Sequence, residues 1–116
     1  MVQLHRKRLV RHKYHAKPTE VDGIKFSSKL ESRYYGQLRI LQKCGEILFF
    51  LRQTGLHLPG NIRYVIDFVE FWAPKNGDQG DVVFTECKGF MTPQAKDKIK
   101  MAEEIYGISI NIVTKV

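Results

Sequence analysis

Apolar residues recur at helical spacing in the first half of the chain. The pattern begins behind Ser28 and runs to about Cys44, where Gly45 is typical of a helix end. The stripe expected to face the core consists of Leu30, Tyr34, Leu38 and Leu41. Ser28 also stands three residues before Glu31, the spacing of a capping box, in which the glutamate bonds back to the amide at the helix start. The sequence therefore predicts a capped amphipathic helix.

A second helix is predicted near the C-terminus. Thr92 is typical of an N-cap and Pro93 of the first helical position, and the pattern ends at Gly107. The residues expected to be buried are Ala95, Ile99, Ala102 and Ile105.

Four segments rich in β-branched and aromatic residues predict strands. In chain order they are Ile47–Leu51, Arg63–Trp72, Asp81–Lys88 and Ile108–Val113. Turns are expected at Pro59-Gly60-Asn61 and from Pro74 to Gly80. The predicted order of elements is therefore α-β-β-β-α-β, an α/β fold with a mixed central sheet flanked by helices.

The dipeptide Asn76-Gly77 predicts how two of these strands pair. It favours a two-residue hairpin turn, because both central positions of that turn need positive φ. Counting outward from this loop places Asp67 opposite Glu86, and opposed residues share a face of the sheet. Lys88, two residues beyond Glu86, shares that face. The register is a hypothesis, since a longer loop would shift it.

Two carboxylates that face each other among apolar neighbours are costly unless their charge is offset. Mg²⁺ suits such oxygen ligands, because it usually takes one or two carboxylates and keeps several waters. The ion would activate a water and offset phosphate charge, and Lys88 would orient the water or stabilise that charge. The alternative is a surface ion pair of Glu86 and Lys88, with Asp67 near a strand end. Glu31 is a further candidate ligand, and a capping role is equally open.

Charge is distributed unevenly along the 116 residues, which carry a net charge of +7. All six charged residues of the segment 1–17 are basic: Arg6, Lys7, Arg8, Arg11, Lys13 and Lys17. The other 99 residues hold 13 Lys and Arg against 12 Asp and Glu. A basic arm of this kind binds phosphates through counterion release, unless it is a solvated tail that aids solubility. We therefore divide the chain into an arm, residues 1–17, and a single domain, residues 18–116.

The apolar residues, cysteines and histidines disfavour a membrane protein, a secreted protein and a protein with a cysteine or histidine metal site. The chain has no 18-residue apolar run and no apolar segment behind its basic N-terminus, which disfavours a membrane span and a secretory signal. Cys44 and Cys87 fit no metal-ligand spacing, so we expect reduced, buried thiols in a cytosolic protein, with a disulfide as the less favoured alternative. His5, His12 and His15 lack the further ligands that a metal site needs.

The acidic residues and their spacing resemble the core of the PD-(D/E)XK nucleases, over about residues 14–116. Asp67 is followed, after 18 residues, by Glu86-Cys87-Lys88, on two adjacent predicted strands, and Glu31 lies on the preceding helix. Ile66 stands where the name motif has proline. Three segments, 13–17, 21–31 and 88–90, are also similar to small phage proteins of this superfamily that resemble Holliday junction resolvases of the archaeal and phage type.

This resemblance implies a restriction-endonuclease-like αβββαβ core and a metal-dependent DNA endonuclease. Asp67 and Glu86 would bind Mg²⁺, with Mn²⁺ as a substitute, Glu31 would complete the ion's environment, and Lys88 would assist the attacking water. A hydroxyl of Ser27 or Ser28 would contribute, and Gln53 would flank the site.

The implied substrate is a four-way DNA junction, cut by paired symmetric nicks in the cytoplasm of a phage-infected host cell. Because two symmetric cuts require two sites, the resemblance also implies a homodimer. Phe49, Phe50, Phe71 and Trp72 would form its interface, or else belong to the core. Two alternatives stay open: a nicking, flap or restriction-like endonuclease, and a non-catalytic DNA-binding module on the same scaffold. An RNA-binding protein would explain the basic arm but leave the acidic cluster unexplained.

Overall fold

A computed structural model of the protein describes residues 19–116, so the basic residues predicted to bind DNA (Arg6, Lys7, Arg8, Arg11, Lys13 and Lys17) and the three N-terminal histidines lie outside the described residues. The described elements are β1 (Thr19–Val21), β2 (Ile24–Phe26), α2 (Lys29–Lys43), β3 (Ile47–Leu58), β4 (Ile62–Trp72), β5 (Val82–Cys87), α3 (Pro93–Tyr106) and β6 (Ile110–Val113). From α2 onward they follow the predicted α-β-β-β-α-β order. Neither described helix is long and apolar enough to cross a membrane.

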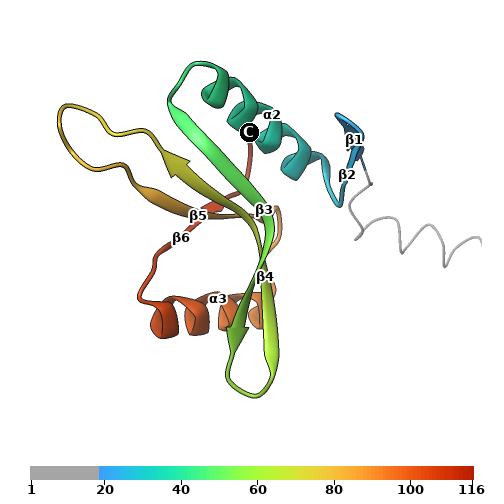
Figure 1. The fold of residues 1–116 in the computed structure, drawn as a ribbon. Coiled ribbons are helices and arrows are strands. Elements are labelled where there is room, and N and C mark those ends of the chain that lie inside the picture. Colours follow the sequence, from blue (N-terminus) through green and yellow to red (C-terminus); the bar gives the residue numbers. More distant parts are fainter. Residues whose placement is uncertain (1–18) are drawn as a thin grey trace, which may run out of the picture.

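The four longer strands form one mixed sheet in the order β3-β4-β5-β6. Pairing is antiparallel except between β5 and β6, which run parallel after the crossover through α3. The α/β class and the mixed sheet with two helices are therefore confirmed. In Figure 1, α2 lies at one end of the long β3–β4 hairpin and α3 at the other.

Both helices begin and end where their capping residues predict. The Ser28 hydroxyl accepts a hydrogen bond from the Glu31 amide (3.1 Å), and the Thr92 hydroxyl accepts one from the Ala95 amide (3.1 Å). Gly107 closes α3 in the left-handed conformation, with φ of 64°. The prediction that Ile105 is buried was wrong: its side chain is 47% exposed, because the helix contacts the sheet mainly through Ile99 and Ala102.

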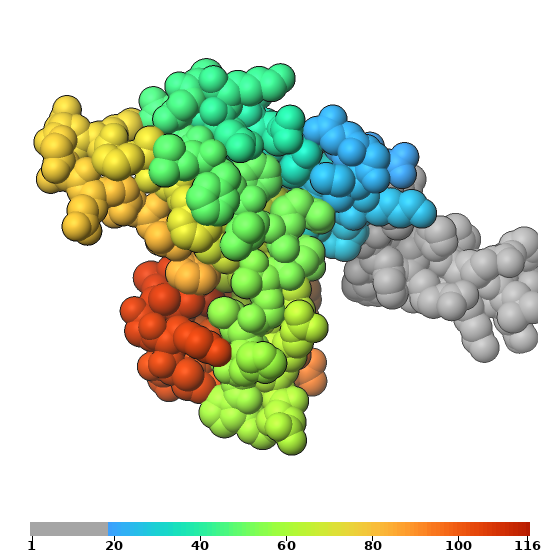
Figure 2. All heavy atoms as spheres, in the orientation of Figure 1, coloured from blue at the N-terminus to red at the C-terminus, as the bar shows by residue number. Residues whose placement is uncertain are grey.

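Two features of the strands differ from the predictions. The first strand does not stop at Leu51 but runs to Leu58, because the polar and small residues that follow still pair with β4 up to Leu58, opposite Ile62. A short β1–β2 hairpin precedes α2, joined by Asp22 and Gly23, which both have positive φ. Figure 2 shows β3 uncovered along one face of the molecule, between α2 and the C-terminal segment.

Near its middle the β3–β4 hairpin has a turnover, a point at which side chains two residues apart point to opposite faces of the sheet. Phe68 of β4 packs in the cluster under α2, whereas Ile66, two residues earlier, packs in the cluster under α3. In a regular strand these two side chains would share a face. On β3, Phe50 and Leu56 are divided between the same two clusters, on either side of Gln53, whose φ is 53°. The cluster under α3 also receives Val69, so it continues past the crossing, where Gln53 and Asp67 lie, whereas the cluster under α2 stays on the Phe68 side of it.

A fully buried carboxylate fixes α2 on the sheet. Glu70 of β4 accepts hydrogen bonds from the Tyr34 hydroxyl of α2 (2.7 Å) and the Trp72 indole N–H (3.0 Å). Because a buried carboxylate without donors is strongly unfavourable, the Tyr34 hydrogen bond favours the face of α2 that meets the strand, and the Trp72 indole supplies a second donor from β4 itself.

The first prediction concerns this contact. Tyr34→Phe leaves Glu70 with a single donor, so we expect the free energy of unfolding, measured by urea denaturation, to fall by about 1–3 kcal/mol. Tyr106→Phe, which removes an exposed hydroxyl bonded to the main chain of His57, is the control and should cost less than about 1 kcal/mol. Equal losses in the two variants would contradict a special role for the buried carboxylate.

Candidate active site at the hairpin crossing

The register predicted from Asn76-Gly77 is confirmed. Asn76 and Gly77 both have positive φ, and the Asp78 amide donates to the Lys75 carbonyl (2.9 Å) across the turn. Along the ladder, Phe68 pairs with Thr85 and Val69 with Phe84, as counting outward from the turn requires.

Asp67 and Glu86 occupy the next positions outward and are joined through main-chain groups. The Glu86 carboxylate accepts from the Asp67 amide (3.1 Å), and the Asp67 carboxylate accepts from the Cys87 amide (2.9 Å). Each side chain thus uses an amide that the strand turnover leaves out of the ladder. The expected convergence of these two residues is present, with Glu86 only 3% exposed.

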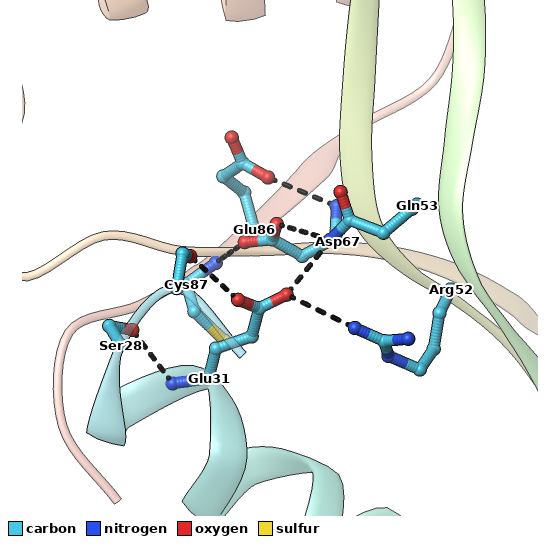
Figure 3. A network of polar contacts seen from close by, with 8 residues as sticks. Ser28, Glu31, Arg52, Gln53, Asp67, Glu86 and Cys87 are labelled. Atoms are coloured by element: carbon cyan, nitrogen blue, oxygen red, sulfur yellow. Dashed lines mark hydrogen bonds and ion pairs between the residues drawn. The ribbon is translucent and has the colours of Figure 1, made fainter. Parts of the chain in front are cut away.

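Glu31 reaches the same place from the first turn of α2. Its carboxylate accepts from the Ser27 hydroxyl (2.9 Å) and from the Gln53 side-chain amide (2.9 Å), and the same Gln53 nitrogen donates to Asp67 (3.3 Å). Figure 3 shows Glu31 pointing from its helix toward Asp67, with Gln53 approaching from the opposite strand. Only one half of the capping box forms: the Ser28 hydroxyl accepts from the Glu31 amide, but the Glu31 carboxylate accepts from Ser27 and Gln53.

The two serines are distinguished by this geometry. Ser28 uses its hydroxyl to cap the helix, whereas the Ser27 hydroxyl contacts the carboxylate cluster. Of the pair named from the sequence, Ser27 is the residue that the structure brings to the site.

Gln53 holds its place at a conformational cost. A non-glycine residue with φ of 53° inside a strand is strained by about 1–3 kcal/mol. It stands opposite Asp67, between the pairs Arg52–Phe68 and Thr54–Ile66. The left-handed conformation directs its amide to both carboxylates, and strain of this kind is found mostly where surrounding structure or function requires it.

Two cations border the cluster. The Lys88 ammonium lies 3.9 Å from the Glu86 carboxylate, and the Arg52 guanidinium lies 4.0 Å from that of Glu31. Arg52, which sequence reasoning missed because its strand was expected to end at Leu51, also lies over the Phe26 ring, 4.5 Å from the centroid. Two positive charges therefore face three carboxylates.

Burial and the crowding of like charges both affect the pKa values of the carboxyl groups. Burial raises the pKa of Glu86 to about 7, with the neighbouring Asp67 charge as the second cause. Burial and then Asp67 also raise the pKa of Glu31. The pKa of Cys87 rises to about 12 through burial and the same carboxylates, so this thiol stays protonated at neutral pH and is no nucleophile.

The two cysteines are both free, as expected. Burial was predicted for both but holds only for Cys87. Cys44 is exposed, because it caps the C-terminal end of α2 at the surface instead of continuing the apolar stripe.

Within residues 19–116, no three His, Cys, Asp or Glu side chains converge with the geometry of a metal cage. The donor set nevertheless fits a hard divalent cation held by few protein ligands, because Asp67 and Glu86 lie together, all their donor atoms are oxygens, and their negative charge is incompletely balanced. Mg²⁺ usually binds through one or two carboxylates and retains its waters, so a three-residue cage is not required.

Comparison with known proteins places the chain in one family. Residues 11–115 match DUF1064, described as a protein of unknown function, and the chain therefore belongs to this family. No curated protein and no solved structure gives a significant match.

The second prediction follows from the crowded carboxylates. The folded protein binds the Glu86 proton more tightly than the unfolded chain, so in EDTA its free energy of unfolding should fall as pH rises from about 4.5 to about 7. Glu86→Gln should flatten this dependence and raise stability at pH 8 by about 1–3 kcal/mol, measured by urea unfolding. The exposed Glu104→Gln is the control and should reproduce the parent curve. A Glu86→Gln curve with the full pH dependence would show that Glu86 is not its source.

Proposed function

We propose that this member of the DUF1064 family is a metal-dependent DNA endonuclease of the Holliday junction resolvase type. One observation carries the proposal: three carboxylates from α2, β4 and β5 (Glu31, Asp67 and Glu86) share one hydrogen-bonded network with Lys88 beside it. Such crowding of negative charge destabilises the fold, and a divalent cation bound at the site would offset the repulsion. The sequence resemblance supplies the substrate class.

Each residue then has a chemical task. Asp67 and Glu86 would hold Mg²⁺, or Mn²⁺ in its place, and Glu31 would complete the environment of the ion. When bound, the ion lowers the pKa of a water and offsets charge on the phosphate in the transition state. Lys88 is partly exposed at the mouth of the cluster, so its ammonium is placed to orient the water and to stabilise the phosphate charge.

Gln53 and Ser27 have a positioning task in this proposal. Gln53 donates to both Glu31 and Asp67 through one nitrogen, which sets the separation of the two carboxylates. Ser27 holds the other oxygen of Glu31. Their hydrogen bonds keep the oxygens oriented before a cation binds, which reduces the reorganisation that binding requires.

Paired nicks in a junction require a second copy of the chain, and an apolar surface supports this part of the proposal. Phe49 stacks on Phe71, with ring centroids 4.4 Å apart, and remains 45% exposed beside the exposed Leu51. Phe50 and Trp72 instead pack under α2. Of the four aromatic residues considered for the interface, Phe49 is therefore the best placed. In this function the protein acts on DNA in the cytoplasm.

The third prediction tests the chemistry. Asp67→Asn and Glu86→Gln should each lower cleavage of a labelled synthetic four-way junction in Mg²⁺ by about a thousandfold, because each removes a metal ligand. Junction binding should persist or strengthen, since each change removes repulsion toward phosphate. Glu104→Gln is the matched control, and EDTA should abolish cutting by the parent protein.

The same assay includes duplex, flap and single-stranded substrates. Symmetric paired nicks confined to the junction are expected. Cutting spread over all substrates would indicate a nicking, flap or restriction-like enzyme. Binding without cutting of any substrate would indicate a non-catalytic DNA-binding module.

The fourth prediction concerns the N-terminal arm. Deleting residues 1–12 removes Arg6, Lys7, Arg8 and Arg11, so junction binding should weaken and depend less steeply on salt. The slope of log K against log salt should fall by up to about 0.9 for each phosphate that the arm no longer neutralises, measured by fluorescence anisotropy. An unchanged slope would contradict phosphate binding by the arm.

A further inference from the structure

A groove of about 300 Å³ opens beside the carboxylate cluster, between β4, the end of β5 and the first turn of α3. Its lining includes Tyr64, Glu86, Lys88, Thr92, Gln94 and Lys98. Because Glu86 and Lys88 belong to the cluster, the groove is a continuation of the candidate active site. Its volume corresponds to about ten waters, enough for a phosphate and part of its sugar.

Tyr64 lines this groove and carries a buried hydroxyl. The side chain is only 7% exposed, and its hydroxyl, although close to the Glu86 carboxylate, makes no hydrogen bond of good geometry with any described residue. Burial and the neighbouring Glu86 charge raise the pKa of Tyr64, so the hydroxyl keeps its proton. A buried donor without an acceptor is costly, and such a group in a native structure commonly marks a place where an external oxygen binds.

The other groups that face the groove favour an anion. Lys98 has no ion pair in the part of the chain that the structure describes, and Lys88 pairs only at 3.9 Å with Glu86. In the first turn of α3, Pro93 lacks an N–H and Thr92 takes that of Ala95, so the Gln94 amide is left to donate. The guanidinium of the neighbouring Arg63 instead packs over a glycine of β3.

We infer that this groove binds the phosphodiester next to the one that would be cut, on the same nucleic-acid strand, with Lys98 supplying charge and the Tyr64 hydroxyl and Gln94 amide supplying hydrogen bonds. The inference rests on the proposed function, because the carboxylate cluster defines which phosphate is cut. It adds a site that directs the strand across β4 toward α3.

Lys98→Ala tests the charge. Binding of a labelled four-way junction in EDTA should weaken about five- to tenfold, and the slope of log K against log salt should fall by about 0.9. Lys100→Ala, on the same helix but outside the groove, is the matched control and should leave both quantities nearly unchanged. Equal effects of the two variants would overturn the proposal.

Tyr64→Phe tests the hydroxyl in a way that separates binding from folding. Since the hydroxyl makes no hydrogen bond of good geometry in the free protein, its removal should leave Tm unchanged or raised. Junction affinity should still fall about five- to tenfold, without a change of salt slope, because the hydroxyl that is removed carries no charge. Unchanged affinity would overturn the role of Tyr64.

Neutral methylphosphonate linkages, placed singly around the junction, identify the phosphate concerned. In the parent protein, a neutral linkage at one position should weaken junction binding. In Lys98→Ala the same linkage should weaken binding little further, because the two changes remove the same interaction. Additive losses at every position would contradict the assignment. If inorganic phosphate at low millimolar concentration displaces the junction from the parent but not from Lys98→Ala, the groove is a site for free anions and the strand assignment fails.

The outcomes separate this inference from the proposed function. If cleavage requires Asp67 and Glu86 but Lys98→Ala and Lys100→Ala bind the junction equally well, the proposed groove site is wrong and the proposed nuclease function stands. Binding that depends on Lys98 and Tyr64, in a protein that cuts no DNA, would keep the groove as a phosphate site and remove the nuclease.

Discussion

The structure depends on how three acidic side chains are held close together at the crossing of the β3–β4 hairpin. Repulsion between Glu31, Asp67 and Glu86 must be met by donors within reach, since Glu31 and Glu86 are each only 3% exposed. The donors are main-chain amides of β4 and β5 and the side-chain amide of Gln53. β3 and β4 leave their regular geometry at this point, and the β4–β5 ladder ends at the pair Phe68–Thr85, so the amides beyond it are free to donate to the carboxylates.

The turnover of the hairpin also explains the division of the core. On β4, Phe68 packs under α2, whereas Ile66 and Val69 on either side of it pack in the cluster under α3, so two separate clusters form on opposite faces. The hydrogen bond from Tyr34 to Glu70 then helps to fix the rotation of α2. Glu31 lies one turn before Tyr34, and its position over Asp67 therefore follows from the same contact.

Much of this could be predicted from short-range signals. The helix limits follow from Ser28, Thr92 and Gly107, and the pairing of Asp67 with Glu86 follows from the turn at Asn76-Gly77. These signals succeed because each depends on the local backbone alone. Asp22-Gly23 is a similar turn signal for the β1–β2 hairpin, but its strands of three residues are too short to show apolar alternation.

The predictions that were wrong concern features that depend on tertiary packing and not on the local backbone. Polar and small residues after Leu51 gave no apolar alternation, although pairing with β4 keeps them extended. The exposure of Ile105 and Cys44 depends on how far each helix extends beyond the sheet. The left-handed Gln53 could not be predicted, because glutamine has no preference for that conformation and only the neighbouring carboxylates favour it.

The three carboxylates are carried by two different parts of the fold, the sheet and α2, and this has a mechanical consequence. Asp67 and Glu86 belong to adjacent strands and are tied by main-chain hydrogen bonds, so their relative position is set by the sheet. Glu31 is carried by a helix and meets this unit through Gln53, with Ser27 and Arg52 holding it from other sides. A shift of α2 along the sheet would therefore carry Glu31 away and leave two carboxylates at the site, so the docking of a single helix sets how much negative charge gathers there.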